Sequence, residues 1–164
     1  MIVVSDAGPL IYLGSVGRLV LLQDLFGRVV VPQQVWDEVV GAGAGRPGSA
    51  AVAVVSWIDV RTAASSSLTE RLHQILDAGE AAAIGLCHEL RAELLLCDDR
   101  EARRVAAVAA AEGIPVVGTL GILVRGKRAG LLEAVGPILK AMLALGLRIS
   151  PDLIDETLVL AGEK

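Results

Sequence analysis

Acidic residues that could bind a metal ion recur at four separated points of a chain that is otherwise rich in Ala, Val and Leu. These residues are Asp6, Asp37 with Glu38, Asp77 with Glu80, and Asp98 with Asp99. Two unit charges about 4 Å apart repel by about 4 kcal/mol at an effective dielectric constant of about 20. If several of these carboxylates share one site, that site therefore needs a divalent cation.

The elements that must position these acids alternate between short apolar runs and helical patterns. The predicted strands span 2–5, 28–31, 57–60, 94–97 and 114–117. The predicted helices span 9–26 with a break near 14–17, 32–40, 67–76, 79–91, 99–112, 119–128, 133–145 and 151–161. This alternation indicates a parallel sheet with helices on both faces. Ligands bind such sheets at the carboxyl ends of the strands, where Asp6 and the Asp98–Asp99 pair lie.

Helix capping is the structural alternative for most of these acids. Three predicted helices start with a cap residue that is followed three positions later by Glu. The pairs are Ser67 with Glu70, Asp77 with Glu80, and Asp98 with Glu101. Asp6 could likewise cap the helix that contains Pro9. For Asp37 and Glu38, helical geometry leaves open which of the two points at the first strand.

The Gly-rich segment 41–48 is predicted to be a flexible surface loop. Its glycines at 43, 45 and 48 match G-x-G-x-x-G. A dinucleotide site needs that motif directly after a strand, whereas here it follows the helical pattern 32–40 and contains Pro47. We therefore interpret the match as a loop.

Length and composition favour one globular domain and restrict its function. The chain has 164 residues, of which 54% are hydrophobic and 2% aromatic. Its net charge is −4 and its pI is about 5.2, which argues against a broad electrostatic grip on nucleic acid. The scarcity of aromatic rings weakens any model based on base stacking. Without a long apolar run or a basic leader we expect a cytoplasmic protein that does not enter membranes.

Other catalytic constellations are poorly supported. His73 and His88 come without a Ser or Cys partner, and Cys87-His88 with Cys97 is too sparse for zinc. Both cysteines are expected to be buried thiols. A phosphotransfer receiver is a further alternative, but it needs an acid pair after its first strand. Here the acid pair follows the fourth predicted strand.

Five segments taken together resemble the PIN-domain family, and more narrowly its VapC-like proteins. They are VVSDAGPLIYL (3–13), VVVPQQVWDEVV (29–40), DAGEAAAIGLC (77–87), LLLCDDREARRVA (94–106) and VVGTLGIL (116–123). The resemblance runs in order over about 1–150. It implies a three-layer α/β/α fold with a central, mostly parallel five-stranded sheet. The whole chain, 1–164, would then be one PIN-like domain, with about 133–164 as a C-terminal helical extension packed on it.

The resemblance also implies an activity and its residues. PIN domains hold Mg²⁺ or Mn²⁺ with acidic residues and hydrolyse RNA, leaving a 5′-phosphate and a 3′-hydroxyl. By motif, the catalytic acids are Asp6, Glu38, Glu80 and Asp99, and the metal ligands are Asp6, Asp99 and Glu80, with Asp98 as a possible substitute. Two positions depart from the family pattern: Cys97 stands where Thr or Ser is usual, and Glu80 stands where many relatives have Asp.

Substrate and partners follow from the same resemblance. Two groups of cations could line the approach of RNA. The first group follows the fourth predicted strand and consists of Arg100, Arg103 and Arg104, and the second follows the last predicted strand and consists of Arg125, Lys127 and Arg128. A toxin of a toxin–antitoxin pair would have a small antitoxin partner, and homodimers are common among relatives. The alternative is a catalytically inactive PIN-like module that binds RNA or a protein.

Overall fold

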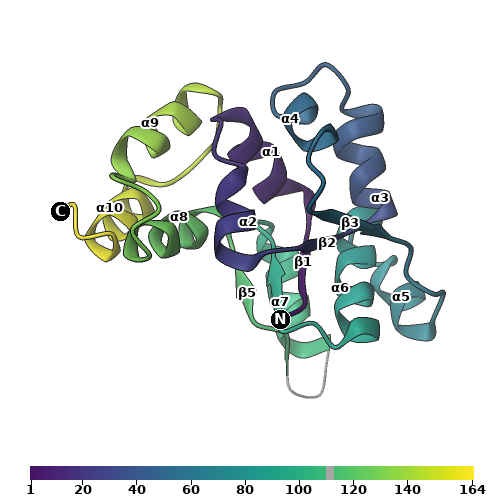
Figure 1. Ribbon diagram of the computed structural model, residues 1–164. Coiled ribbons are helices and arrows are strands. Elements are labelled where there is room, and N and C mark those ends of the chain that lie inside the picture. The colour runs from purple at the N-terminus through teal and green to yellow at the C-terminus, as the bar shows by residue number, and fades with distance from the viewer. Residues whose placement is uncertain (110–112) are drawn as a thin grey trace.

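The computed structural model describes residues 1–109 and 113–164 (Figure 1). Its centre is a five-stranded sheet in the order β3-β2-β1-β4-β5. The strands are β1 (Val3–Ser5), β2 (Val29–Pro32), β3 (Ile58–Arg61), β4 (Leu94–Leu96) and β5 (Val116–Val117). Every pairing is parallel, so the predicted α/β sheet is confirmed and is parallel throughout.

Helices connect and cover these strands. They are α1 (Ala7–Ser15), α2 (Val20–Phe26), α3 (Gln33–Trp36), the π-helix η1 (Asp37–Ala42), α4 (Ser49–Ala53), α5 (Ser67–Leu72), α6 (Ala78–Leu90), α7 (Arg100–Ala109), α8 (Thr119–Arg128), α9 (Gly136–Ala144) and α10 (Pro151–Leu160). The short helix α4 was not predicted. The predicted helix 99–112 is helical over α7, and 110–112 lie outside the described residues.

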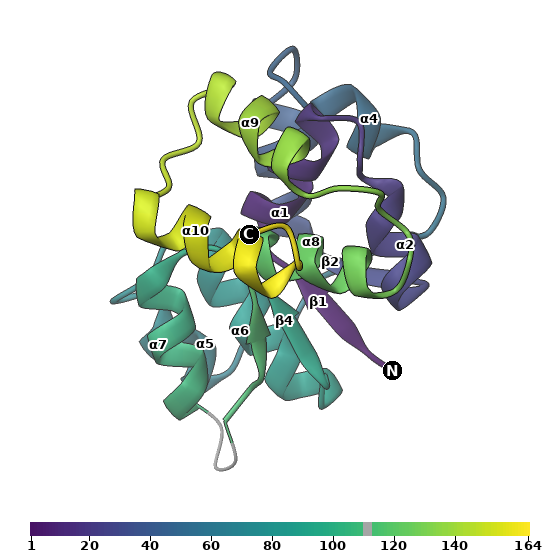
Figure 2. The same ribbon diagram turned by 90° about the vertical axis from the view of Figure 1, so that its left-hand side faces the viewer.

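Alternate residues of each strand serve two separate cores. Val3 and Leu96 face the core that contains α1, α2, α8 and α9. Their neighbours Val4 and Leu95 face the core that contains α6 and α7. This period of two follows from strand geometry, and full burial of such a side chain contributes about 1.5–3 kcal/mol. The result is the predicted three-layer α/β/α arrangement. Its two helical layers are visible on opposite sides of the sheet in Figures 1 and 2.

The C-terminal helices share the first of these cores. Leu139 and Met142 of α9 are fully buried in the same cluster as Val3. Helix α10 lies along α8 (Figure 2). None of the helices in the described part of the chain is both long and apolar enough to cross a membrane.

The segment 41–48 is at the surface, as predicted, but it packs closely on α1. Backbone bonds tie it together, from Arg46 N to Gly43 O at 3.0 Å and from Ser49 N to Arg46 O at 3.2 Å. Gly48 has φ +86°, and a Cβ there would lie 2.7 Å from the carbonyl oxygen of Ile11. Only glycine allows this backbone approach. The segment is therefore a wall attached to α1 rather than a free loop.

Candidate active site

Asp6 lies where β1 passes into α1, beside the end of β4. Its amide donates to the carbonyl of Leu96 at 2.9 Å, and its side chain is 7% exposed. Although Asp6 is the N-cap residue of α1, its carboxylate makes no capping bond, so the capping alternative for Asp6 is wrong. Instead its Oδ2 accepts a bond from the Cys97 thiol at 3.6 Å.

Burial and neighbouring charges make Asp6 reluctant to ionise. Its pKa is raised from 3.8 to about 6, mainly by desolvation and further by the charges of Asp77 and Glu38. The adjacent Ala7 amide and the bond from the Cys97 thiol lower the pKa in part. An ionised carboxylate here gains stability from any cation that reaches it.

Glu38, rather than Asp37, faces the other acids. The Glu38 carboxylate lies against the start of α6, where a Cβ on Gly79 would be 3.1 Å from Oε2. Its pKa is raised by burial and then by the charge of Asp77. Asp37 instead accepts a bond from Gln33 Nε2 at 2.8 Å on the exposed side. The wide turns of η1 carry both residues, and single π-turns are frequent at functional sites.

Asp77 and Glu80 form the predicted capping box at the start of α6. Asp77 Oδ1 accepts from the Glu80 amide at 2.8 Å, and Glu80 Oε2 accepts from the Asp77 amide at 3.2 Å. The pKa of Glu80 is nevertheless raised to about 7, first by desolvation and then by the charges of Asp77, Asp99 and Asp6. Glu80 therefore caps α6 and also lies among the other acidic side chains.

Asp77 also lies in this acidic neighbourhood, since its charge raises the pKa of Asp6, Glu38 and Glu80 alike. From the sequence we counted it among the acids that could share a site but left it out of the predicted catalytic and metal-binding residues. Its position three residues before Glu80 was the available signal, because a cap residue and the third helical residue lie on the same end of a helix.

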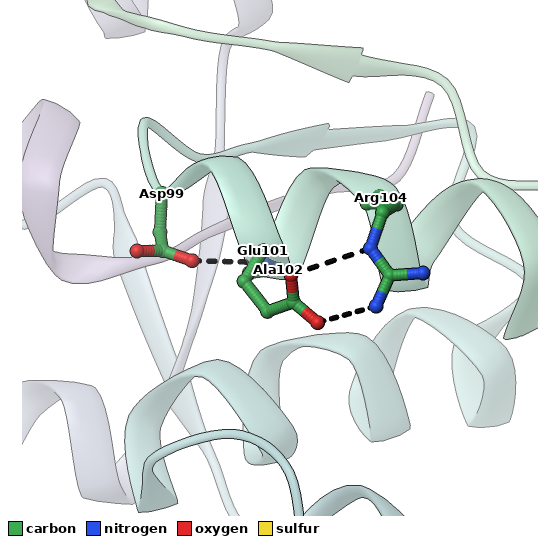
Figure 3. Close-up of polar contacts among 4 residues, drawn as sticks. All are labelled: Asp99, Glu101, Ala102 and Arg104. Atoms are coloured by element: carbon green, nitrogen blue, oxygen red, sulfur yellow. Dashed lines mark hydrogen bonds and ion pairs between the residues drawn. The ribbon is translucent and has the colours of Figure 1, made fainter.

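The Asp98–Asp99 pair behaves differently from its prediction. Asp99, not Asp98, caps α7, since Asp99 Oδ1 accepts from the Ala102 amide at 2.8 Å (Figure 3). Glu101 does not complete this cap but pairs with Arg104, whose Nε donates to Oε2 at 3.2 Å (Figure 3). The helix starts one residue later than predicted, which moves each role by one position. Ser66 likewise replaces Ser67 as the cap of α5.

Asp98 points to the turn between β5 and α8. Its Oδ1 accepts from the Thr119 amide at 2.7 Å and its Oδ2 from the Thr119 hydroxyl at 2.6 Å. Gly8 and Gly118 leave the space it occupies, because a Cβ on either would lie 2.8 Å from a carboxylate oxygen. The charges that raise the pKa values of Asp6, Glu38 and Glu80 come from the other acids. Asp98 therefore joins β4 to α8 in this conformation.

The remaining acids form one neighbourhood, which we call the acid group. It consists of Asp6, Glu38, Asp77, Glu80 and Asp99. No ion pair within residues 1–109 and 113–164 includes any member of this group. Over the same residues, no three Asp, Glu, His or Cys side chains are already placed to hold a metal ion together. The group is therefore a set of neighbouring carboxylates that no cationic side chain among the described residues neutralises.

The predicted substrate cations separate into two kinds. Arg104 pairs with Glu101, and Lys127 pairs with Glu163 at 3.7 Å. Arg125 and Arg128 instead line a cavity of about 520 Å³ beside Asp98, together with Arg103 and Arg148. Arg100 is exposed at the first turn of α7 and lies outside that cavity.

We call this cavity the arginine cleft. Its floor is aliphatic and includes Val117 of β5, Leu120 of α8 and Leu153 of α10. Arg148 was missed from the sequence because only the folding of α10 against α8 brings it to this cleft. Four arginines and two acids, Asp98 and Glu156, line the cleft, so it offers net positive charge next to the strand end that carries Asp98 and Asp99.

Comparison with known proteins identifies the family. The chain matches the family model DUF3368, a PIN domain, over residues 2–163. The chain therefore belongs to the PIN-domain family, as the resemblance indicated. PIN domains are typically nucleases, so the fold is that of a hydrolase acting on nucleic acid. No curated protein and no solved structure matches the chain.

Proposed function

We propose that this protein is an endoribonuclease that depends on Mg²⁺ or Mn²⁺ bound by the acid group. The observation that carries the proposal is the acid group itself. Its carboxylates come from separate parts of the chain, and the pKa values of Asp6 and Glu80 are raised to about 6 and about 7. Like charges gathered without a cation are the arrangement that a divalent ion stabilises.

The donor set suits a hard cation. Mg²⁺ takes oxygen ligands, usually one or two carboxylates and several waters. We assign Asp6 and Asp99 as the primary ligands because each lies at a strand end. Glu80 and Glu38 would bind directly or through water. Asp98 is the weaker candidate, since both of its oxygens accept bonds from Thr119.

The chain's own residues then have distinct tasks. When bound, the cation would acidify a water and offset charge on the phosphate. Asp6 is held in place by the Cys97 thiol and by its backbone bond to Leu96. Glu38 and Glu80 complete the charge balance and orient the attacking water. By family likeness, the products carry a 5′-phosphate and a 3′-hydroxyl.

Phosphates on either side of the scissile bond need cations, and the net charge of −4 means that these must be local. The arginine cleft is the best such patch, so we propose Arg125 and Arg128, with Arg103 and Arg148, as phosphate contacts. Arg100, Arg104 and Lys127 remain secondary candidates. The partners we propose are RNA, a small antitoxin that would make this protein a toxin, and a second copy of the chain.

A second candidate function is a PIN-like module that binds RNA or a protein without cutting. It is favoured by the finding that no three ligand side chains among the described residues are already in place for a metal ion. The capping bond of Glu80 to the Asp77 amide is one reason, since it directs Oε2 to the helix start.

An RNA cleavage assay distinguishes the two functions. Wild-type protein is expected to cut single-stranded or structured RNA with Mg²⁺ or Mn²⁺ and to stop in EDTA. Asp6→Asn should lower the rate by at least about a hundredfold while the protein stays folded. Asp37→Asn is the matched control, because Asp37 lies outside the acid group and should leave the rate unchanged. Equal activity in Asp6→Asn would refute the assignment, and RNA binding without cleavage by the wild type would favour the binding module.

A further inference from the structure

A second cavity, of about 260 Å³, shares the side chain of Glu38 with the acid group. It opens between α1 and the wall formed by 41–48, and we call it the Tyr12 pocket. Its walls include Ile11, Tyr12, Glu38, Val39, Arg46 and Pro47. Glu38 belongs both to this pocket and to the acid group, so whatever fills the pocket lies next to the proposed site of cleavage.

The pocket is shaped by backbone packing. A Cβ on Gly14 would lie 3.0 Å from the carbonyl oxygen of Gly48, so the two backbones nearly touch. This contact and the turns of 41–48 fix Arg46 and Pro47 opposite Ile11 and Tyr12. Gly48, the last glycine of the G-x-G-x-x-G match, thus allows this wall of the pocket to approach α1.

The four aromatic residues are all partly buried against the hydrophobic core; they are Tyr12, Phe26, Trp36 and Trp57. Tyr12 also lines the pocket. Burial and then the charge of Asp98 raise the pKa of the Tyr12 hydroxyl. The one tyrosine of the chain shares this pocket with Glu38, a member of the acid group.

The remaining lining carries polar groups at its edge. Arg46 is exposed, and within residues 1–109 and 113–164 it forms no ion pair. Apolar side chains from Ile11, Val39 and Pro47 line the same cavity as the ring, while Arg46 and Glu38 offer a donor and an acceptor. A nucleobase has the same character, with apolar faces and polar edges. Unpaired RNA bases are recognised by aromatic stacking together with hydrogen bonds to their edges.

We propose that the Tyr12 pocket holds one nucleobase of the RNA substrate, next to the bond that is cut. The ring of Tyr12 provides the stacking surface, and Arg46 contacts the edge of the base or its phosphate. The proposal rests on the proposed function, because it takes RNA as the substrate. According to this proposal, residues of α1 and 41–48, rather than the acid group, determine which bond of the RNA is cleaved.

Binding of fluorescent RNA in EDTA tests the pocket without cleavage. Short single-stranded RNAs carry 2-aminopurine at one position each, and stacking quenches its fluorescence. The wild type is expected to quench one position strongly. Tyr12→Ala should lose that quenching and raise the Kd by about 5- to 100-fold. Tyr12→Phe keeps the ring and should keep the quenching.

Arginine variants provide a second measurement that does not depend on Tyr12→Ala folding correctly. Arg46→Ala should weaken binding and reduce the slope of log Kd against log salt by about 0.7. Arg28→Ala is the matched control, since Arg28 is exposed just before the amino end of β2, whereas Asp6 follows the carboxyl end of β1. If the Tyr12→Ala or the Arg46→Ala protein binds RNA and quenches its fluorescence like the wild type, the proposal that the Tyr12 pocket holds a nucleobase is refuted.

Failure of the pocket and failure of the nuclease proposal give different results. Hydrolysis of the small diester bis(p-nitrophenyl) phosphate by the wild type with Mn²⁺ reports the acid group alone, whereas hydrolysis of RNA reports the acid group and the pocket together. If the wild type hydrolyses neither but binding depends on Tyr12, the nuclease proposal falls and the pocket stands. If it cuts RNA at the same positions after Tyr12→Ala, the pocket proposal falls and the nuclease stands.

Discussion

Two kinds of carboxylate in this molecule differ in what surrounds them. Glu163, after α10, accepts bonds from the amides of Val135 and Gly136 at 2.7 and 3.0 Å and pairs with Lys127. These donors hold its pKa below the usual value of 4.5. The carboxylates of Asp6 and Glu80 have no cation among the described residues, and their pKa values are raised to about 6 and about 7. The structural carboxylate of Glu163 has hydrogen-bond donors and a cation that stabilise its ionised form, whereas the acid group has too few such donors to do so.

The difference has an energetic consequence. Raising the pKa of a carboxyl from 3.8 to about 6 means that its ionised form destabilises the fold by about 3 kcal/mol. That is a large share of the stability of a small domain, commonly about 5–15 kcal/mol. Such an unfavourable ionisation is expected at functional sites, where a bound ion or substrate can stabilise the charged form.

The largest expected effect on stability is at Asp6. Because the pKa of Asp6 is raised in the folded state, its favourable contribution is complete below pH 3.8 and is lost as the pH rises through about 6. Asp6→Asn removes the charge and should raise the free energy of unfolding at pH 7.5 by up to about 3 kcal/mol. Urea denaturation at pH 4 and 7.5, without divalent metal, measures this. An Asp6→Asn protein that is less stable than the wild type at pH 7.5 would contradict the conclusion that the ionised Asp6 carboxylate destabilises the fold.

Glu163 is expected to respond in the opposite direction and less strongly. Glu163→Gln weakens the two bonds to the start of α9 and the pair with Lys127, and should lower the free energy of unfolding by about 1 kcal/mol. Because its pKa is lowered, this contribution is present above pH 4.5 and is lost as the pH falls through the lowered value. The same denaturation series measures it. A gain in stability, or a change in metal response, would remove the distinction between the two kinds of carboxylate.

The smallest effect is expected at Cys97, the buried donor to Asp6. Cys97→Ala removes the thiol bond of 3.6 Å and should weaken Mn²⁺ binding by about tenfold or less, since groups that orient metal ligands typically contribute 10- to 100-fold and a thiol is a weak donor. Cys97→Ser keeps a donor and should restore the affinity. Calorimetric titration of both variants tests this. Equal losses in the two would indicate packing rather than donation.

Much of the positioning framework was predictable because it depends on local patterns. Apolar runs gave the five strands within one or two residues, and Asp6 was placed correctly at the end of β1. The one-residue errors at Asp98 and Ser67 have a common cause. Adjacent polar residues at a helix start are equivalent in sequence, and only the backbone angle decides which one caps.

The less predictable features depend on contacts between distant segments. Asp77 joins the acid group because α6 packs against α3, and Arg148 reaches the arginine cleft because α10 packs on α8. The packing of Gly48 on Gly14 likewise joins two segments more than thirty residues apart. Periodicity describes each segment alone and does not report such contacts.

Calorimetric titration of metal-free protein with Mn²⁺ at pH 7.5 tests the central claim most directly. The acid group predicts saturable binding to the wild type, with partial proton release from Glu80, whose pKa is about 7, seen as a dependence of the heat on the buffer. Asp6, whose pKa is about 6, is already ionised at this pH and releases almost no proton. Asp6→Asn should lose this binding, and Asp37→Asn should keep it. Absence of saturable binding to the wild type, or equal binding to Asp6→Asn, would contradict the claim that the acid group is built for a divalent cation.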